Sequence, residues 1–143
     1  MAASDPASSV PPRVLLVLPD QWPRALLRAA LREVGYDALG APGLAGAARY
    51  RVQAPGRGPV RLVLVDQSAL DDASATLLPA LLQRHANPAS ILVTRATASP
   101  PVPSAAAHVP WNRSVRRPVS IAELVALVQQ LLPLPPESAR PID

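Results

Sequence analysis

Continuous runs of apolar residues recur along the chain, and segments with mixed polar and apolar positions separate them. The clearest runs lie within residues 13–18, 60–66 and 90–94, and a weaker run lies within 36–41. Runs rich in Val and Leu are typical of strands in a parallel sheet that helices cover on both faces. A further short strand is predicted near Ser114 and Val115.

The segments between these runs show helical spacing. From Arg24 onward, Leu27, Leu31 and Val34 fall on one helical face, and Gly35 stands where helices commonly end. Further helices are predicted over 44–51, 77–84 and 120–132, with Thr76 as the cap of the second and a Ser120–Glu123 capping box opening the third. Four prolines within 98–110 leave room only for a helical turn at 104–108.

This alternation of strands and helices predicts an α/β fold. We expect a doubly wound, flavodoxin-like domain with a five-stranded parallel sheet, helices on both faces and a fourth helix that is short or broken. The domain is expected to cover residues 13–132, between a disordered tail at 1–12 and a flexible tail at 133–143. A length of 143 residues suits one such domain.

Composition narrows the chemistry that the chain can perform. The absence of cysteine excludes disulfides, thiolate metal sites and a cysteine nucleophile. All 14 basic residues are arginines, and they are scattered along the chain, so we interpret most of them as solvated surface and expect no nucleic-acid binding. No apolar run reaches the roughly 20 residues that a membrane span needs, and no signal peptide is visible at the N-terminus. We therefore expect a cytoplasmic protein without a membrane contact.

Asp66 is the first candidate for a functional role, because it follows directly on the central apolar run. In open α/β sheets, ligands and reacting groups gather beyond the carboxyl ends of the strands. A structural reading stands beside this one: Asp66 caps a turn or pairs with Arg117. His85 and His108 lack the spacing of metal ligands. No catalytic constellation is visible, so we expect that the protein is not an enzyme.

The order and spacing of several segments together resemble the receiver domain of bacterial response regulators. These segments are residues 14–17, Gly35-Tyr36, 62–66, 91–94 and Arg117-Pro118. In that family, the aspartate that ends the third strand accepts a phosphoryl group from a histidine kinase, and an acidic pair after the first strand holds Mg²⁺. A Thr or Ser that ends the fourth strand and a Lys before a Pro contact the phosphoryl group, which needs positioning and positive charge.

The resemblance implies a role for each residue at a matching position. Asp66 corresponds to the phosphoacceptor and Thr94 to the hydroxyl partner, while Arg117 stands where the family has lysine. Leu18 and Pro19 occupy the positions of the acidic pair, and Asp20 comes one place later. Asp20 and Asp66 are therefore the candidate ligands for Mg²⁺, and the missing pair argues against binding of the ion. Ser114 falls at the aromatic switch position.

These departures favour a stand-alone atypical receiver, or pseudo-receiver. It would present a surface to a protein partner, either a histidine kinase or a downstream effector, with weak or absent phosphorylation. The first alternative is a working phosphorelay receiver that a histidine kinase phosphorylates on Asp66. The second is a small α/β domain that binds a nucleotide or another ligand at the strand ends. Trp22 and Trp111 are expected to be partly buried at loop edges; exposure would make them candidates for partner contact.

Overall fold

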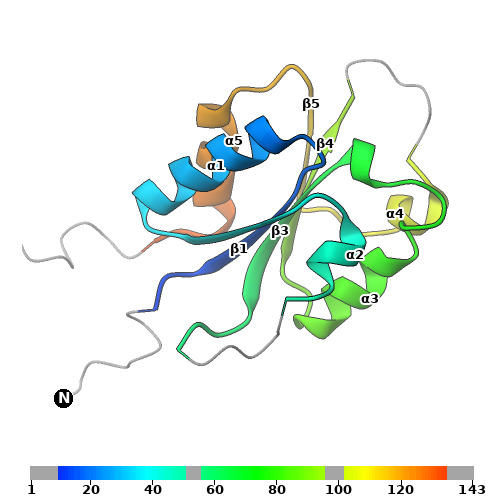
Figure 1. The fold of residues 1–143 in the computed structure, drawn as a ribbon, viewed down its shortest axis with the longest axis horizontal. Coiled ribbons are helices and arrows are strands. Elements are labelled where there is room, and N and C mark those ends of the chain that lie inside the picture. The colour runs from blue at the N-terminus through cyan, green and yellow to red at the C-terminus, as the bar shows by residue number, and fades with distance from the viewer. Residues whose placement is uncertain (1–9, 51–55, 96–101, 135–143) are drawn as a thin grey trace, which may run out of the picture.

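The computed structural model describes residues 10–50, 56–95 and 102–134, which form a sheet between two layers of helices (Figure 1). The strands are β1 (Arg13–Val17), β2 (Asp37–Ala41), β3 (Val60–Asp66), β4 (Ala89–Thr94) and β5 (Arg113–Arg116). They lie in the order β2-β1-β3-β4-β5, and each neighbouring pair is parallel. The prediction of a doubly wound, five-stranded parallel sheet is confirmed.

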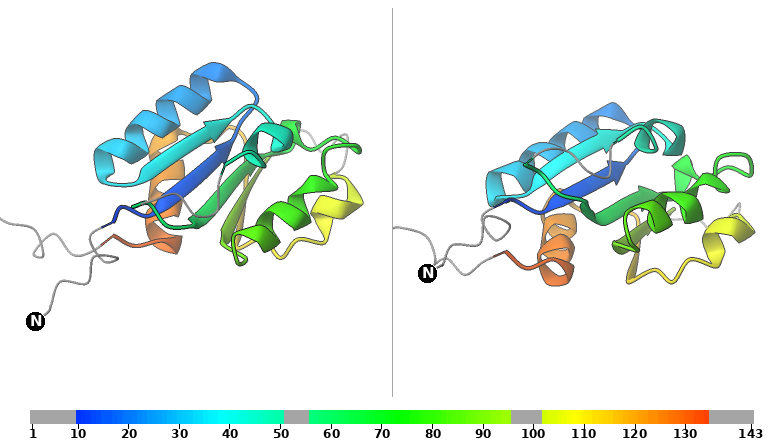
Figure 2. Two further views of the ribbon diagram at one scale, coloured as in Figure 1. Left: turned by 60° about the horizontal axis from the view of Figure 1, so that its bottom comes forward. Right: turned by 90° about the horizontal axis from the view of Figure 1, so that it is seen from below.

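Helices cover both faces of the sheet, as Figure 2 shows. One face carries α1 (Gln21–Val34) and α5 (Ile121–Leu131). The other carries α2 (Leu44–Ala47), α3 (Leu77–Arg84) and α4 (Ser104–Ala107). The fourth helix has only 4 residues, as the prolines around it predict. Within the described ranges, no helix has both the length and the apolar character needed to cross a membrane.

The core consists of two apolar clusters, one on each side of the central strands. Leu15 and Val63 face α2 and α3, whereas Leu16 and Leu64 face α1 and α5. This alternation follows from the strand period of two, because successive side chains point to opposite faces. Burying each such leucine stabilises the fold by about 1.5–3 kcal/mol. The two central strands therefore form a rigid base for the groups at their carboxyl ends.

Local signals set the ends of the longest helices. Gly35 follows α1 with φ of 127°, and its N–H bonds back to the carbonyls of the last turn. At the start of α5, the N–H of Glu123 donates to Ser120 Oγ at 3.0 Å, and the N–H of Ser120 donates to Glu123 Oε1 at 3.4 Å. The predicted capping box is confirmed.

The structure departs from the sequence prediction at three local points. Helix α2 ends at Ala47, earlier than expected. Thr76 occupies the N-cap position of α3, as predicted, but its hydroxyl donates backward to Ala73 O at 3.0 Å and makes no capping hydrogen bond. Residues Gln67–Ala69 form a short 3-10 helix, an element that was not predicted. The predicted tails fall mostly outside the described residues, which begin at 10 and end at 134.

One prediction about exposure is also wrong, and one arginine is an exception to the solvated majority. Arg13 is 2% exposed, because its guanidinium donates to Gly58 O and lies near the Asp37 carboxylate. Trp22 is 75% exposed on α1, although partial burial was expected. Trp111 is partly buried as predicted, and its indole N–H donates to Ala106 O at 3.0 Å.

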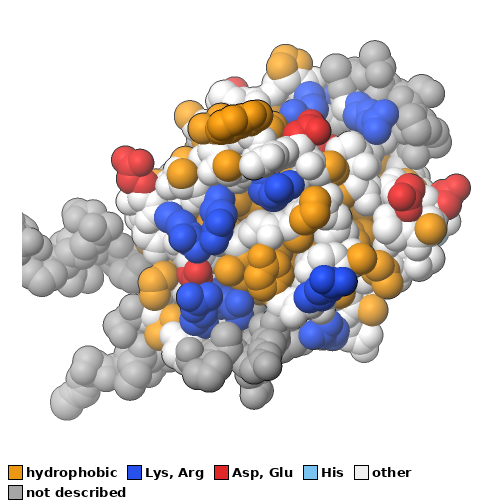
Figure 3. Space-filling view, in the orientation of Figure 1, with side chains coloured by type: hydrophobic (Ala, Val, Ile, Leu, Met, Phe, Trp, Pro, Cys, Tyr) orange, Lys and Arg blue, Asp and Glu red, His pale blue; other side chains and the backbone are white. Residues whose placement is uncertain are grey.

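Arginines of α1 also protect the edge strand β2. The Nε atoms of Arg28 and Arg32 donate to Ala38 O at 3.0 and 3.3 Å, and the Tyr50 hydroxyl donates to Gly40 O at 2.6 Å. Unpaired carbonyls on an edge strand would otherwise accept hydrogen bonds from another chain. Basic side chains lie at several separate places on the face that Figure 3 displays, and some of them hold backbone carbonyls rather than facing only water.

Candidate functional site

The Asp66 carboxylate lies at the carboxyl end of β3 and is 2% exposed. Four residues of an apolar strand, Leu62 to Val65, lead into it, and the chain then turns into the 3-10 helix. Asp66 caps this helix: its Oδ1 accepts from the N–H of Ser68 at 2.9 Å and from the Ser68 hydroxyl at 2.7 Å. One carboxylate oxygen is therefore committed to holding the turn.

The other oxygen of Asp66 faces a cation. Arg117 Nη2 donates to Asp66 Oδ2 and forms an ion pair with it. Arg117 follows β5, precedes Pro118 across a cis peptide bond, and is held by its N–H, which donates to Thr94 O at 2.9 Å. Burial raises the pKa of Asp66, but the hydrogen bonds from Arg117 and Ser68 outweigh it and bring the pKa below its usual value. The carboxylate is therefore ionised and weakly basic.

Thr94 ends β4 beside this pair, but its hydroxyl has another partner. Thr94 Oγ1 donates to Val115 O at 3.2 Å, which joins the end of β4 to β5. The side chain is partly exposed, so a change of rotamer would bring the hydroxyl out of this bond. The structure thus brings Asp66 and Arg117 into contact and leaves Thr94 bonded to the backbone next to them.

Gln67 and Ser68 take part in the site, although neither was a candidate on sequence grounds. Gln67 is 8% exposed, and its Oε1 accepts from the N–H of Arg95 at 2.9 Å, which ties the end of β3 to the segment after β4. Ser68 supplies both donors to Asp66 Oδ1. An Asp followed two residues later by Ser is a known local capping pattern, so the Asp66–Ser68 contact could have been predicted from the sequence. The Gln67 bond joins residues 28 positions apart and carries no such local signal.

The residues near Asp66 do not form a good Mg²⁺ site. Asp20 is exposed, precedes α1 and makes no capping bond with its side chain. The carbonyls of Leu18 and Pro19 already accept from the Arg24 guanidinium, at 2.6 and 3.3 Å. Among residues 10–50, 56–95 and 102–134, no group of three His, Cys, Asp or Glu side chains is placed to hold a metal. Mg²⁺ needs several oxygen ligands. The Arg24 guanidinium at the end of β1 and the Asp66 carboxylate, which is already paired with Arg117, do not provide them.

A hollow of about 290 Å³ lies beside the site, at the same edge of the sheet. Its wall includes Gln67, Ser68, Asp71, Asp72 and Arg95, but neither Asp66 nor Arg117. Asp71 is bound by the N–H and hydroxyl of Ser74 at 2.6 and 2.7 Å, and these bonds bring its pKa below the usual value. Asp71 and Asp72 are both exposed to solvent.

Comparison with known proteins rests on structure. No family model matches the sequence, and no curated protein matches it. A response regulator receiver protein from Pseudomonas putida superposes with a TM-score of 0.65 at 23% identity, over 85% of this chain and 98% of that one. The chain has the receiver fold. A CheY-like receiver domain from Methanospirillum hungatei gives a TM-score of 0.64 at 18% identity, over 84% of this chain and 92% of that one.

An orphan response regulator of H. pylori also shares this receiver fold, with a TM-score of 0.61 and 19% identity over 85% of this chain and 96% of that one. At such identities the likeness shows the fold alone. Within the receiver fold, the resemblance seen in the sequence places Asp66 at the acceptor position and Arg117 at the lysine position. The geometry described above shows that these two side chains contact each other directly.

Proposed function

We propose that this chain is an atypical receiver-like signalling module that acts by presenting a surface to a partner protein, with weak or absent phosphorylation of Asp66. The observation that carries the proposal is that both oxygens of the Asp66 carboxylate already have partners, Ser68 on one side and Arg117 on the other. The proposal assigns the chain no enzymatic activity and a place in the cytoplasm.

Phosphoryl uptake would require one carboxylate oxygen to attack phosphorus in line with the leaving group. Here that attack must first break a charge-assisted hydrogen bond with Arg117 or the two bonds with Ser68. The lowered pKa of Asp66 works in the same direction, because a less basic carboxylate is a weaker nucleophile. In a phosphorylated receiver, a cationic side chain contacts the phosphoryl group. Here Arg117 makes that contact with the unmodified Asp66 carboxylate.

An exposed apolar pair on α1 supports the protein-interaction part of the proposal. Trp22 and Leu26 are 75% and 55% exposed, and they lie one helical turn apart on the same side of α1. Tryptophan is among the residues that contribute most to protein–protein binding. The partner, a histidine kinase or a downstream effector, is expected to cover this pair.

Incubation with acetyl phosphate and Mg²⁺, followed by intact-mass spectrometry, tests the proposal. We expect little or no species carrying one added phosphoryl group, and no change in melting temperature with beryllofluoride. Stoichiometric, Mg²⁺-dependent modification that Asp66→Asn abolishes would overturn it.

Mg²⁺-dependent modification that Asp66→Asn abolishes would support the second candidate function, a working phosphorelay receiver. One observation favours this candidate: Arg117 places a permanent positive charge beside the acceptor position. It would need Arg117 to leave Asp66 and Asp20 to reach the ion. Arg117→Lys then distinguishes the two readings, because a working receiver should gain phosphoryl uptake from a compact ammonium in this position.

A further inference from the structure

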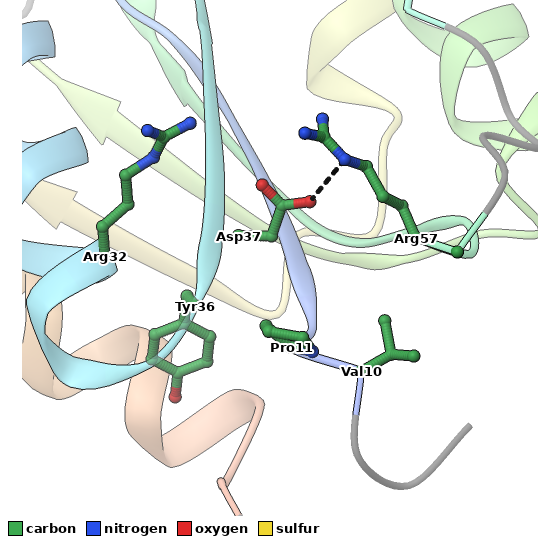
Figure 4. A pocket seen from close by; sticks show the side chains of 7 residues that line it. Val10, Pro11, Arg32, Tyr36, Asp37 and Arg57 are labelled. Atoms are coloured by element: carbon green, nitrogen blue, oxygen red, sulfur yellow. Dashed lines mark ion pairs between the residues drawn. The ribbon is translucent and has the colours of Figure 1, made fainter. Parts of the chain in front are cut away.

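A second cavity lies at the opposite edge of the sheet, beyond the amino-terminal ends of β1 and β2. It has a volume of about 420 Å³, within the range of small-molecule sites. Its wall includes Val10, Pro11, Arg32, Tyr36, Asp37 and Arg57 (Figure 4). The strands run between this cavity and Asp66, so nothing in the candidate site described above lines it.

The charges around this cavity do not balance. Asp37 is the acidic residue of the wall, and it is shared by Arg13 and Arg57, whose Nε atoms lie 3.7 and 3.8 Å from its Oδ2. Arg32 approaches from α1 on the other side of Asp37, as Figure 4 shows. Two guanidinium groups thus share one carboxylate, and a third lines the same cavity. An adjoining hollow of about 290 Å³ adds Arg61 next to Arg13 and Arg57.

Two of these arginines are available for an anion. Arg57 is 55% exposed in its side chain, and its ion pair with Asp37 is long, so little is lost when Arg57 turns to another acceptor. Arg32 donates a hydrogen bond only from its Nε, to Ala38 O. Within the described ranges, its terminal nitrogens have no hydrogen-bond partner. Guanidinium groups present parallel donors that match the oxygens of phosphate.

The rest of the wall is apolar. Val10 and Pro11 line one side, and the Tyr36 ring closes the cavity below. The Tyr36 hydroxyl points away toward the end of α5, where it donates to Leu132 O at 2.6 Å. A ligand here would place an anionic group between Arg32 and Arg57 and a flat or apolar part against Pro11 and Val10.

We propose that this cavity binds a small phosphate-bearing ligand of nucleotide size, with the phosphate held by Arg32 and Arg57. The site is independent of Asp66 and does not rest on the function proposed above. It gives the domain a ligand-responsive edge opposite the carboxyl ends of its strands.

Isothermal titration calorimetry of the full chain with ADP, pyrophosphate and adenosine tests this inference. ADP and pyrophosphate are expected to bind, more weakly as salt concentration rises, and adenosine is expected not to bind. Arg32→Gln and Arg57→Gln should each weaken ADP binding about ten-fold, the loss expected for one charge-assisted hydrogen bond. Asp37→Asn should tighten binding, because it removes the carboxylate that competes for Arg57 and repels phosphate.

Arg28→Gln is the matched control for Arg32→Gln. Arg28 donates to the same Ala38 carbonyl but does not line the cavity, so its loss disturbs the β2 edge and leaves the anion contacts intact. Binding of ADP by this variant should be unchanged, and its melting temperature shows the purely structural effect.

Three results would overturn the inference. The first is the absence of binding heat with both ADP and pyrophosphate at millimolar concentration. The second is binding that Arg32→Gln and Arg57→Gln leave unchanged, or that adenosine reproduces. The third is binding of a single-stranded oligonucleotide that Arg28→Gln weakens as much as Arg32→Gln, which would indicate a nucleic-acid surface instead of a small-ligand cavity.

Discussion

Replacing Arg117 by methionine removes the guanidinium from Asp66 and keeps a flexible apolar side chain of similar length. The Asp66 carboxylate, 2% exposed in the native protein, would keep only the two Ser68 hydrogen bonds on Oδ1. Oδ2 would lose its partner. The change therefore asks how much the ion pair contributes to the stability of the carboxyl edge of the sheet.

The expected loss follows from the burial of the two partners. A hydrogen bond to a charged group contributes about 1.5–3 kcal/mol, and breaking a fully buried ion pair costs about 3–5 kcal/mol. The Arg117 side chain is 38% exposed, so water screens the pair and can replace the lost donor. We expect the variant to lose about 1.5–2 kcal/mol of unfolding free energy, a fall in melting temperature of roughly 5–8 °C.

Urea unfolding of a double-mutant cycle measures the pair itself. The cycle consists of Arg117→Met, Asp66→Asn and the double variant, with Arg116→Met as the control on an exposed neighbouring arginine. The coupling between the two positions should be about 1 kcal/mol or more. Additivity within about 0.3–0.5 kcal/mol would refute the reasoning, because contacting charges that stabilise each other cannot act independently.

The contribution of the Asp66–Arg117 pair to folding stability should depend on pH in a defined direction. The folded pKa of Asp66 lies below its unfolded value of 3.8, so the stability that it contributes is fully present above that pH. This contribution is lost as the pH falls through the folded pKa. The stability difference between the native protein and Arg117→Met should therefore be constant at neutral pH and shrink in strong acid. A difference that grows in acid would contradict it.

Three further changes test other parts of the structure. His85 is 2% exposed, and burial together with the nearby Arg84 and Arg13 lowers its pKa below 6.5. Folding stability should therefore fall as the pH drops below 6.5. In thermal melts, His85→Leu should reduce this dependence on pH, while a change at the exposed His108, His108→Gln, should leave it unchanged. Trp22→Ser should leave the melting temperature nearly unchanged and remove the tryptophan emission that acrylamide quenches most readily; a large loss of stability would show that Trp22 is packed. Ser120→Ala should cost about 1 kcal/mol of unfolding free energy through the capping box, and an unchanged urea midpoint would contradict that role.

Strands and capped helices could be predicted from the sequence because their signals are local. The bounds of β3 were predicted correctly, since the four consecutive apolar residues Leu62 to Val65 run directly into a charged residue. The capping box of α5 needs only Ser120 and Glu123, three residues apart. The break in the fourth helix follows from proline chemistry alone. Each of these features depends on neighbours in the chain.

Burial and partner choice were decided by tertiary structure. Nothing in the local sequence around Arg13 predicts its burial. Its burial is favourable because the fold places the Gly58 carbonyl and the Asp37 carboxylate beside its guanidinium. Trp22 is exposed because no other segment among the described residues covers that side of α1. The Gln67 side chain, in the short helix after β3, accepts from the backbone N–H of Arg95, 28 residues away. No local pattern contains these partners.

Asp66 shows both contributions in one residue. Its residue type and its place at the end of a buried central strand follow from the local sequence. Whether its carboxylate is free to react was decided by Arg117, which is 51 residues distant in the chain and arrives there only when β5 completes the sheet. The physical reason is that strand formation is set by local apolar periodicity, whereas the state of a buried charge is set by whichever counter-charge the fold brings beside it.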